Sequence, residues 1–193
     1  MGVYFVPPQL TEEQWLSGQD YEAVIKFAIW RNPRKFSLAQ TAQFRLVWDS
    51  LDEKRRLAVE TIEALAVGVD STETSNQQYA ALCEDFGRLT DAYAQLYPEG
   101  GTDNPRLAAV RDLYEVFGNP FRLVAVDPAW RTSDVMLLAT GIYAERAFDR
   151  MPILADALQD AGCDSDEILN HLRDPNATHV RGCWALDLVL GKA

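Results

Sequence analysis

Histidine and cysteine are scarce in this chain of 193 residues, which contains two histidines and three cysteines. A catalytic metal site built on several histidines is therefore nearly excluded. The sequence also lacks GxGxxG, a Walker phosphate loop, GxSxG and HExxH. These absences argue against the common nucleotide-binding, serine-hydrolase and zinc-protease sites. The cysteines form no closely spaced pair, so we expect reduced thiols and a cytoplasmic protein.

Long hydrophobic runs are also absent, and positively charged residues are fewer than negatively charged ones. No apolar run approaches the ~20 residues that a membrane-spanning helix needs, so we expect no membrane partner. The start of the chain does not resemble a signal peptide, because Pro7 and Pro8 interrupt it at once. Eighteen Lys and Arg against 29 Asp and Glu give a net charge of −11. Such acidity disfavours general nucleic-acid binding but permits a basic protein partner or nucleic-acid mimicry. Its simplest explanation is that the negative charge keeps the protein soluble.

The apolar residues recur at helical spacing along nearly the whole chain, which predicts an all-α fold. A capping box at 11–14 begins the first helix, Asp20 caps the second, and a second capping box is expected at 37–40. Asp52 is expected to cap a helix whose inward residues include Leu57. A long helix is expected over 77–97, and later helices over 107–117, 133–150, 153–161, 165–173 and 179–190. The sequence predicts an irregular bundle of roughly nine or ten helices.

Two stretches interrupt this helical pattern. The Pro- and Gly-rich stretch 98–105 is the strongest breaker. We expect one helical domain over 1–193, with a sub-boundary near 98–105 that would separate 1–97 from 106–193. The second stretch, 118–132, is apolar but bounded by prolines and too short for a helix. It predicts an extended segment that packs across the helices, with the C-terminal helix docked into the core.

Four strings in the C-terminal half carry a resemblance to a known family: FGNPFR (117–122), DPAW (127–130), YAERAFDRMPILADAL (143–158) and HVRGCW (179–184). They resemble a C-terminal module of planctomycete-type helical bacterial proteins, which often follows a helical segment similar to residues 11–66. No activity, substrate or cofactor comes with this resemblance. Family members often occur beside large signalling or repeat proteins, which implies a partner-binding role.

The rare residues gather near the C-terminal end, where Cys163, His171, His179 and Cys183 offer a set of zinc ligands. His179 and Cys183 are four residues apart, which would place them on one face of a helix. Against zinc, the set lacks a CxxC knuckle, and buried free cysteine is common in protein cores. A second alternative is a cysteine-dependent enzyme centred on Cys183, whose thiol His179 and Arg181 would activate. Close helix packing at Gly182 is the simpler interpretation of that stretch.

The remaining candidates are arginines and a tryptophan of the kind that anchor protein interfaces. Five residues form the predicted partner-binding set: Arg122, Trp130, Arg146, Arg150 and Arg181. Glu145 and Asp149 could pair for acid–base chemistry, but ion pairs with the neighbouring arginines are the simpler interpretation. The leading hypothesis is therefore a non-enzymatic adaptor or regulatory module that binds another protein and holds no cofactor. The alternatives are a small zinc-stabilised module and the cysteine-dependent enzyme.

Overall fold

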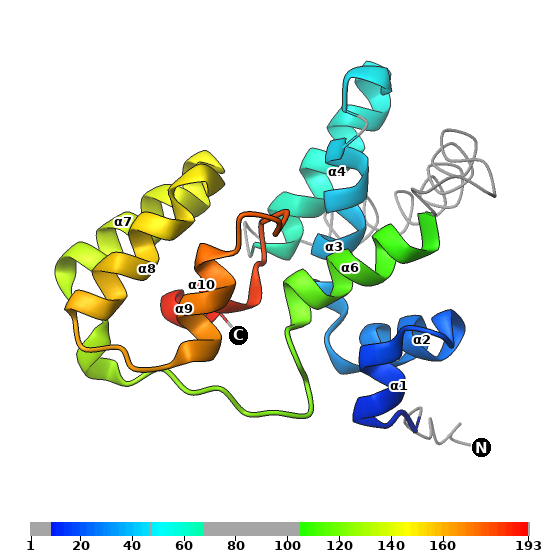
Figure 1. Ribbon diagram of the computed structural model, residues 1–193. Coiled ribbons are helices and arrows are strands. Elements are labelled where there is room, and N and C mark those ends of the chain that lie inside the picture. The colour runs from blue at the N-terminus through cyan, green and yellow to red at the C-terminus, as the bar shows by residue number, and fades with distance from the viewer. Residues whose placement is uncertain (1–8, 47, 68–104, 193) are drawn as a thin grey trace, which may run out of the picture. The chain divides into compact units, whose positions relative to one another are not determined.

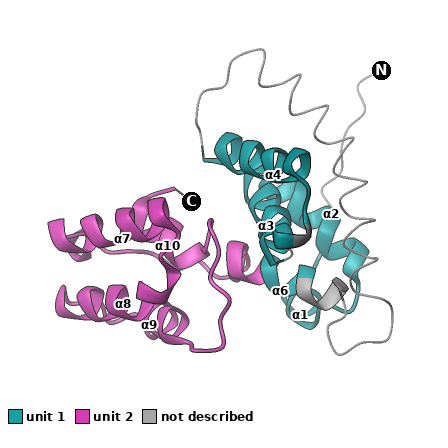
Figure 2. Cartoon of the chain, turned by 90° about the horizontal axis from the view of Figure 1, so that it is seen from above, with its two compact units in different colours: residues 1–113 teal, residues 114–193 magenta. Residues whose placement is uncertain are grey.

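The computed structural model describes residues 9–46, 48–67 and 105–192 (Figure 1). Every regular element in these ranges is a helix, which confirms the predicted all-α fold. The chain divides into two compact units, residues 1–113 and 114–193 (Figure 2). The helix expected over 77–97 and most of the sub-boundary expected near 98–105 lie outside the described residues. The division between the units lies further along the chain, within a helix.

Among its described residues, unit 1 comprises four complete helices and the first part of a fifth. Its elements are α1 (Glu12–Ser17), α2 (Tyr21–Arg31), α3 (Pro33–Leu46), a 3-10 helix (Trp48–Ser50), α4 (Glu53–Ala66) and the beginning of α6 (Pro105–Phe117). Helix α3 packs against both α2 and α4. Fully buried apolar side chains fill the space among the helices, including those of Trp15, Val24, Leu38 and Val59. The core of this unit is therefore formed by amphipathic helices, as the apolar spacing predicts.

Local side-chain signals explain where the helices of unit 1 begin. The Thr11 hydroxyl accepts from the Gln14 amide, and the Gln14 side chain accepts from the Thr11 amide, so the first capping box is confirmed. The second predicted capping box is wrong. Helix α3 begins at Pro33, which suits a first turn because it has no amide hydrogen to leave unpaired. Ser37 lies inside that helix, and its hydroxyl donates to the Pro33 carbonyl. The prediction that Leu57 faces the core is also wrong, since its side chain is 63% exposed.

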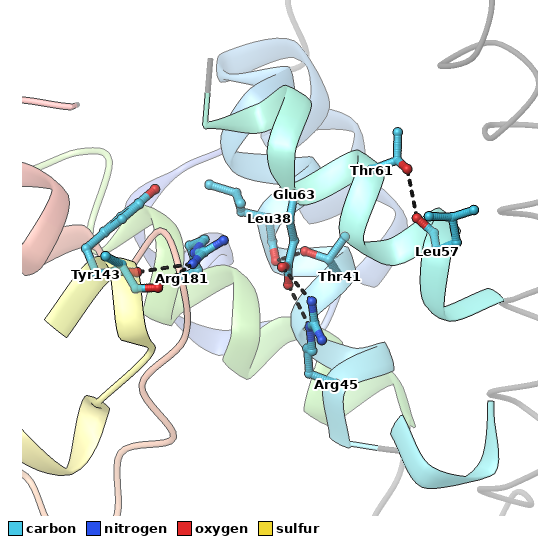
Figure 3. A network of polar contacts seen from close by, with 9 residues as sticks. Leu38, Thr41, Arg45, Leu57, Thr61, Glu63, Tyr143 and Arg181 are labelled. Carbon is cyan, nitrogen blue, oxygen red and sulfur yellow. Dashed lines mark hydrogen bonds and ion pairs between the residues drawn. The ribbon is translucent and has the colours of Figure 1, made fainter. Parts of the chain in front are cut away.

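A buried ion pair joins α3 to α4. Arg45 donates from Nε to Oε1 of Glu63 at 3.0 Å and from Nη2 to Oε2 at 2.8 Å (Figure 3). The Glu63 side chain is only 4% exposed, whereas that of Arg45 is 22% exposed. The Arg45 guanidinium also lies 3.9 Å from the centre of the Trp48 ring. The Arg45 guanidinium therefore compensates the negative charge of a carboxylate that water barely reaches.

Unit 2 contains the end of α6 and four further helices. These are α7 (Ser133–Glu145), α8 (Met151–Asp160), α9 (Asp166–Arg173) and α10 (Trp184–Leu190), with 3-10 helices at Pro128–Trp130 and Phe148–Arg150. Helix α8 packs against α7 and α9, and α10 packs against α7. Leu154, Leu158, Leu172 and Leu186 are fully buried among them. The C-terminal helix is thus docked into the core of its unit, as predicted.

The segment 118–132 contains no α-helix, as predicted, but it is not extended throughout. The Arg122 amide donates to the Asn119 carbonyl in a turn, and a 3-10 helix lies at Pro128–Trp130. Its predicted packing is wrong. The Leu123 side chain is 98% exposed and that of Phe121 is 38% exposed, so neither fills the core. The Asn119 side chain accepts from the Phe121 amide and turns the chain just after α6.

Two helix boundaries in unit 2 differ from the sequence prediction because of left-handed residues. Helix α7 ends at Glu145, since Arg146 adopts φ 54° and caps it. Glu145 and Asp149 therefore do not share one helix, although Arg150 does pair with Glu145 at 3.3 Å. Helix α10 begins at Trp184 rather than at His179, because Gly182 has φ +93° and cannot continue a right-handed helix. The residues from His179 to Cys183 form a turn instead.

Candidate metal centre

Four potential metal ligands converge inside unit 2. They are Glu115, His171, His179 and Cys183, and their ligand atoms all lie within 4.8 Å of one another. Glu115 comes from the last turn of α6, and His171 comes from the last turn of α9. His179 lies in the segment between α9 and α10, and Cys183 is the N-cap residue immediately before α10. Separate segments thus deliver each ligand to one place.

The Glu115 carboxylate lies between the two histidines. Its Oε1 accepts from Nδ1 of His179 at 3.0 Å, and its Oε2 lies 3.4 Å from Nε2 of His171. The Glu115 side chain is 7% exposed, and that of His179 is 6% exposed. Burial by itself would raise the pKa of Glu115, but the hydrogen bonds and charges of His171 and His179 outweigh burial and lower this pKa. The two imidazoles therefore favour the ionised carboxylate, which is the form that binds metal.

Cys183 completes the group and faces the same nitrogen of His171 as Glu115 does. Its Sγ lies 3.2 Å from Nε2 of His171, and its side chain is fully buried. Burial raises the pKa of the Cys183 thiol well above its ordinary value, and the Glu115 carboxylate raises it further. Without a cation the thiol is accordingly held in its protonated form. A thiol of this kind is a poor nucleophile, which weighs against the cysteine-dependent enzyme.

The spacing of these atoms resembles that of a tetrahedral metal site. With metal–ligand bonds of about 2.0–2.3 Å, neighbouring ligand atoms lie about 3.3–3.6 Å apart. Three contacts within the group measure 3.0, 3.2 and 3.4 Å, and the four ligand atoms all lie within 4.8 Å of one another. In addition, Nε2 of His179 is buried and has no hydrogen-bond partner among the described residues. This nitrogen is not the one that faces Glu115, and a single cation cannot be bound by both nitrogens of one imidazole ring.

The centre contains three of the four predicted zinc ligands and replaces the fourth. Cys163 is buried but is not part of the group, and Glu115 stands in its place. Glu115 was not predicted, because nothing in the sequence distinguishes it from the other charged residues of α6, which are Arg106, Arg111 and Asp112. His179 and Cys183 do come together, although a turn rather than a helical face brings them there.

The predicted partner-binding residues occupy different environments within unit 2. Arg122 is exposed, Trp130 is half-buried, and Arg150 pairs with Glu145. Arg181 serves the fold instead, because its Nη2 donates to the carbonyls of Tyr143 at 3.2 Å and Ala144 at 3.3 Å (Figure 3). Arg146 is half-buried at the end of α7. The structure therefore leaves Arg122 and Arg150 as the most accessible of the five.

No protein-family model, curated protein or solved structure matches this chain. Its class therefore rests on its own residues: a helical protein with a buried group of two imidazoles, one carboxylate and one thiol. None of the helices in the described ranges is both long enough and apolar enough to cross a bilayer.

Proposed function

We propose that this chain is a zinc-stabilised helical module whose C-terminal unit binds one zinc ion through Glu115, His171, His179 and Cys183. The observation that supports this proposal is the convergence of four ligand atoms within 4.8 Å at a buried position.

The donor set favours zinc over the other common divalent cations. Thiolate and imidazole ligands suit zinc, whereas magnesium and calcium prefer sites made only of oxygen. Two anionic ligands, the thiolate of Cys183 and the carboxylate of Glu115, would balance the charge of one Zn²⁺. A neutral complex is the least costly way to hold a divalent ion in a buried site. Zinc also supplies the positive charge that the thiolate of Cys183 needs.

The arrangement favours a stabilising role over a catalytic one. Four protein ligands complete the tetrahedral shell of zinc, whereas catalytic sites keep one position for water or substrate. The ligands join the end of α6, the end of α9, the segment between α9 and α10, and the start of α10. The segment 174–183 has no helix of its own, and one metal ion would fix both His179 and Cys183 within it.

The two buried cysteines of unit 2 provide a matched test. Cys183 is 0% exposed and Cys163 is 4% exposed, yet only Cys183 belongs to the group. The full chain would be purified without a metal-binding tag, stripped with a chelator and titrated with zinc against a chromophoric competitor. We expect one zinc per native chain, loss of tight binding in Cys183→Ala, and unchanged binding in Cys163→Ala.

Cobalt gives an independent view of the same ligands. Co²⁺ bound to the native chain is expected to show a thiolate charge-transfer band and the intense visible bands of a tetrahedral site. Cys183→Ala should remove the charge-transfer band, while Cys163→Ala should keep it. A native chain that takes up no stoichiometric zinc would refute the proposal, as would a Cys183→Ala variant with the affinity of the native chain.

A second candidate function is that of a non-enzymatic adaptor that binds another protein. It is supported by the segment around Arg122, where Leu123 is almost entirely exposed and Phe121 is partly exposed. Large apolar side chains on an accessible extended segment are typical of interaction sites. Arg122→Ala and Leu123→Ser should each reduce capture of a partner from the native host, whereas Leu57→Ser, at an exposed position of unit 1, should not. Equal capture by all variants would contradict this role for the segment.

A further inference from the structure

One aromatic side chain adjoins both the metal-binding group and the end of α6. Trp184 follows Cys183 directly in the sequence, and its ring centre lies 5.0 Å from that of His171 at an interplanar angle of 46°. On its other side, the indole packs against Gly118, which lies three residues beyond Glu115. Trp184 therefore contacts the His171 ring and is also the residue next to Cys183 in the sequence.

Glycine is the one residue at position 118 that this contact tolerates. A Cβ atom at this position would lie 2.9 Å from Cγ and 3.1 Å from Cδ2 of Trp184, closer than such atoms approach in proteins. Gly118 also adopts φ +62°, and its amide donates to the Tyr114 carbonyl at 2.8 Å where α6 ends. The absence of a side chain thus lets the indole lie directly on the backbone beside Glu115.

The orientation of His171 decides whether the four ligands converge. Its Nε2 faces Sγ of Cys183 at 3.2 Å and Oε2 of Glu115 at 3.4 Å, so a rotation of the ring would lose both contacts. The aromatic rings against it are those of Trp184 and of His179, the latter at 5.1 Å. Loss of a group that orients a ligating histidine typically costs about 10- to 100-fold in metal affinity.

We propose that Gly118 and Trp184 are positioning residues of the zinc centre: the indole seated on Gly118 fixes the plane of the His171 ring. This inference rests on the proposed zinc site and adds to it the pair of residues that sets its geometry. A side chain at position 118 would displace the indole, and His171 would then no longer face Cys183 and Glu115 together.

Gly162 offers a matched control for a substitution at Gly118. It also has a left-handed backbone, with φ +91°, but a Cβ atom there would meet nothing within 4 Å. Gly118→Ala and Gly162→Ala therefore share the strain of placing alanine at positive φ. The two variants differ in the clash with Trp184, so a difference between them in metal binding reports that contact.

The test measures zinc affinity and the Co²⁺ spectrum of the full chain. We expect Gly118→Ala to bind zinc about 10- to 100-fold more weakly than the native chain, with weaker visible Co²⁺ bands, and Gly162→Ala to match the native chain. Trp184→Leu creates no clash and should also weaken binding by about tenfold, which keeps the test decisive if Gly118→Ala does not fold. In a Trp184→Ala background, Gly118→Ala should cost less affinity than it does in the native background, because Cγ and the ring atoms that the added Cβ would meet are gone.

The outcomes separate the two proposals. If the native chain binds zinc but Trp184→Leu and Gly118→Ala bind it with native affinity and native Co²⁺ spectra, the positioning role is wrong and the zinc site stands. Equal weakening by Gly118→Ala and Gly162→Ala would also overturn the positioning role, since backbone strain alone would account for it. If the native chain binds no zinc, both proposals fail.

Discussion

Replacement of Arg45 by methionine is expected to be among the most destabilising single changes in unit 1. The change removes the bidentate ion pair that Arg45 makes with the Glu63 carboxylate, whose side chain is 4% exposed. Breaking a buried ion pair from one side costs about 3–5 kcal/mol. Because the Arg45 side chain is 22% exposed, water would reach the carboxylate from that side, and the lower part of the range applies. We therefore expect a loss of about 3 kcal/mol for Arg45→Met.

The stacking of Arg45 on Trp48 adds a smaller contribution. A guanidinium over an indole contributes about 0.5–1 kcal/mol at a partly exposed site. Methionine retains contact with the ring through its sulfur, so part of this contribution survives the substitution. The double variant Arg45→Met/Glu63→Leu removes both charges and should recover most of the stability, since an apolar pair of similar volume often replaces a buried ion pair without loss.

Urea unfolding followed by far-UV circular dichroism would measure these free energies. The control is Lys26→Met, which removes an exposed ion pair with Glu22 whose side chains are 66% and 81% exposed. That variant should unfold at the same urea concentration as the native chain. The reasoning is refuted if Arg45→Met costs less than about 1 kcal/mol, or if the double variant is as unstable as the single one.

Four further variants test other parts of the structure. Trp15→Ala should cost about 3–5 kcal/mol, because a fully buried indole is lost from the core; thermal unfolding would measure it. Thr11→Ala should cost about 1 kcal/mol through the lost helix cap, and a Thr11→Ser variant should restore it. Leu123→Ser should change stability by less than about 0.5 kcal/mol, since its side chain is 98% exposed. Gly182→Ala should weaken zinc binding without a change in helix content by circular dichroism, because the left-handed turn that joins His179 to Cys183 would be strained.

Helix content and many helix boundaries could be predicted from the sequence, because the signals that fix them are local. Thr11, Asp20 and Asp52 cap helices through their own side chains, as expected. Predictions failed where a local signal had two interpretations. Ser37 fits a capping box, but Pro33 supplies an earlier start, and helix continuation is then favoured over a new cap.

The candidate site was only partly predictable, since its ligands depend on how distant segments pack. The grouping of His171, His179 and Cys183 is visible in the sequence because these residues are close together in the chain. Glu115 is 56 residues before His171, and nothing in its neighbourhood marks it as a ligand. Cys163 looked equivalent to Cys183, but it precedes α9 and its buried side chain lies outside the group.

The short distance along the chain between His179 and Cys183 also affects the unfolded protein. Two ligands four residues apart can hold a zinc ion without any tertiary structure, and His171 is near enough to join them. Metal would then remain attached to part of the denatured ensemble, and the stabilisation that zinc gives the fold would be smaller than its affinity for the native chain implies. Refolding would start from a chain that already carries its ion, with the docking of α6 as the step that adds Glu115.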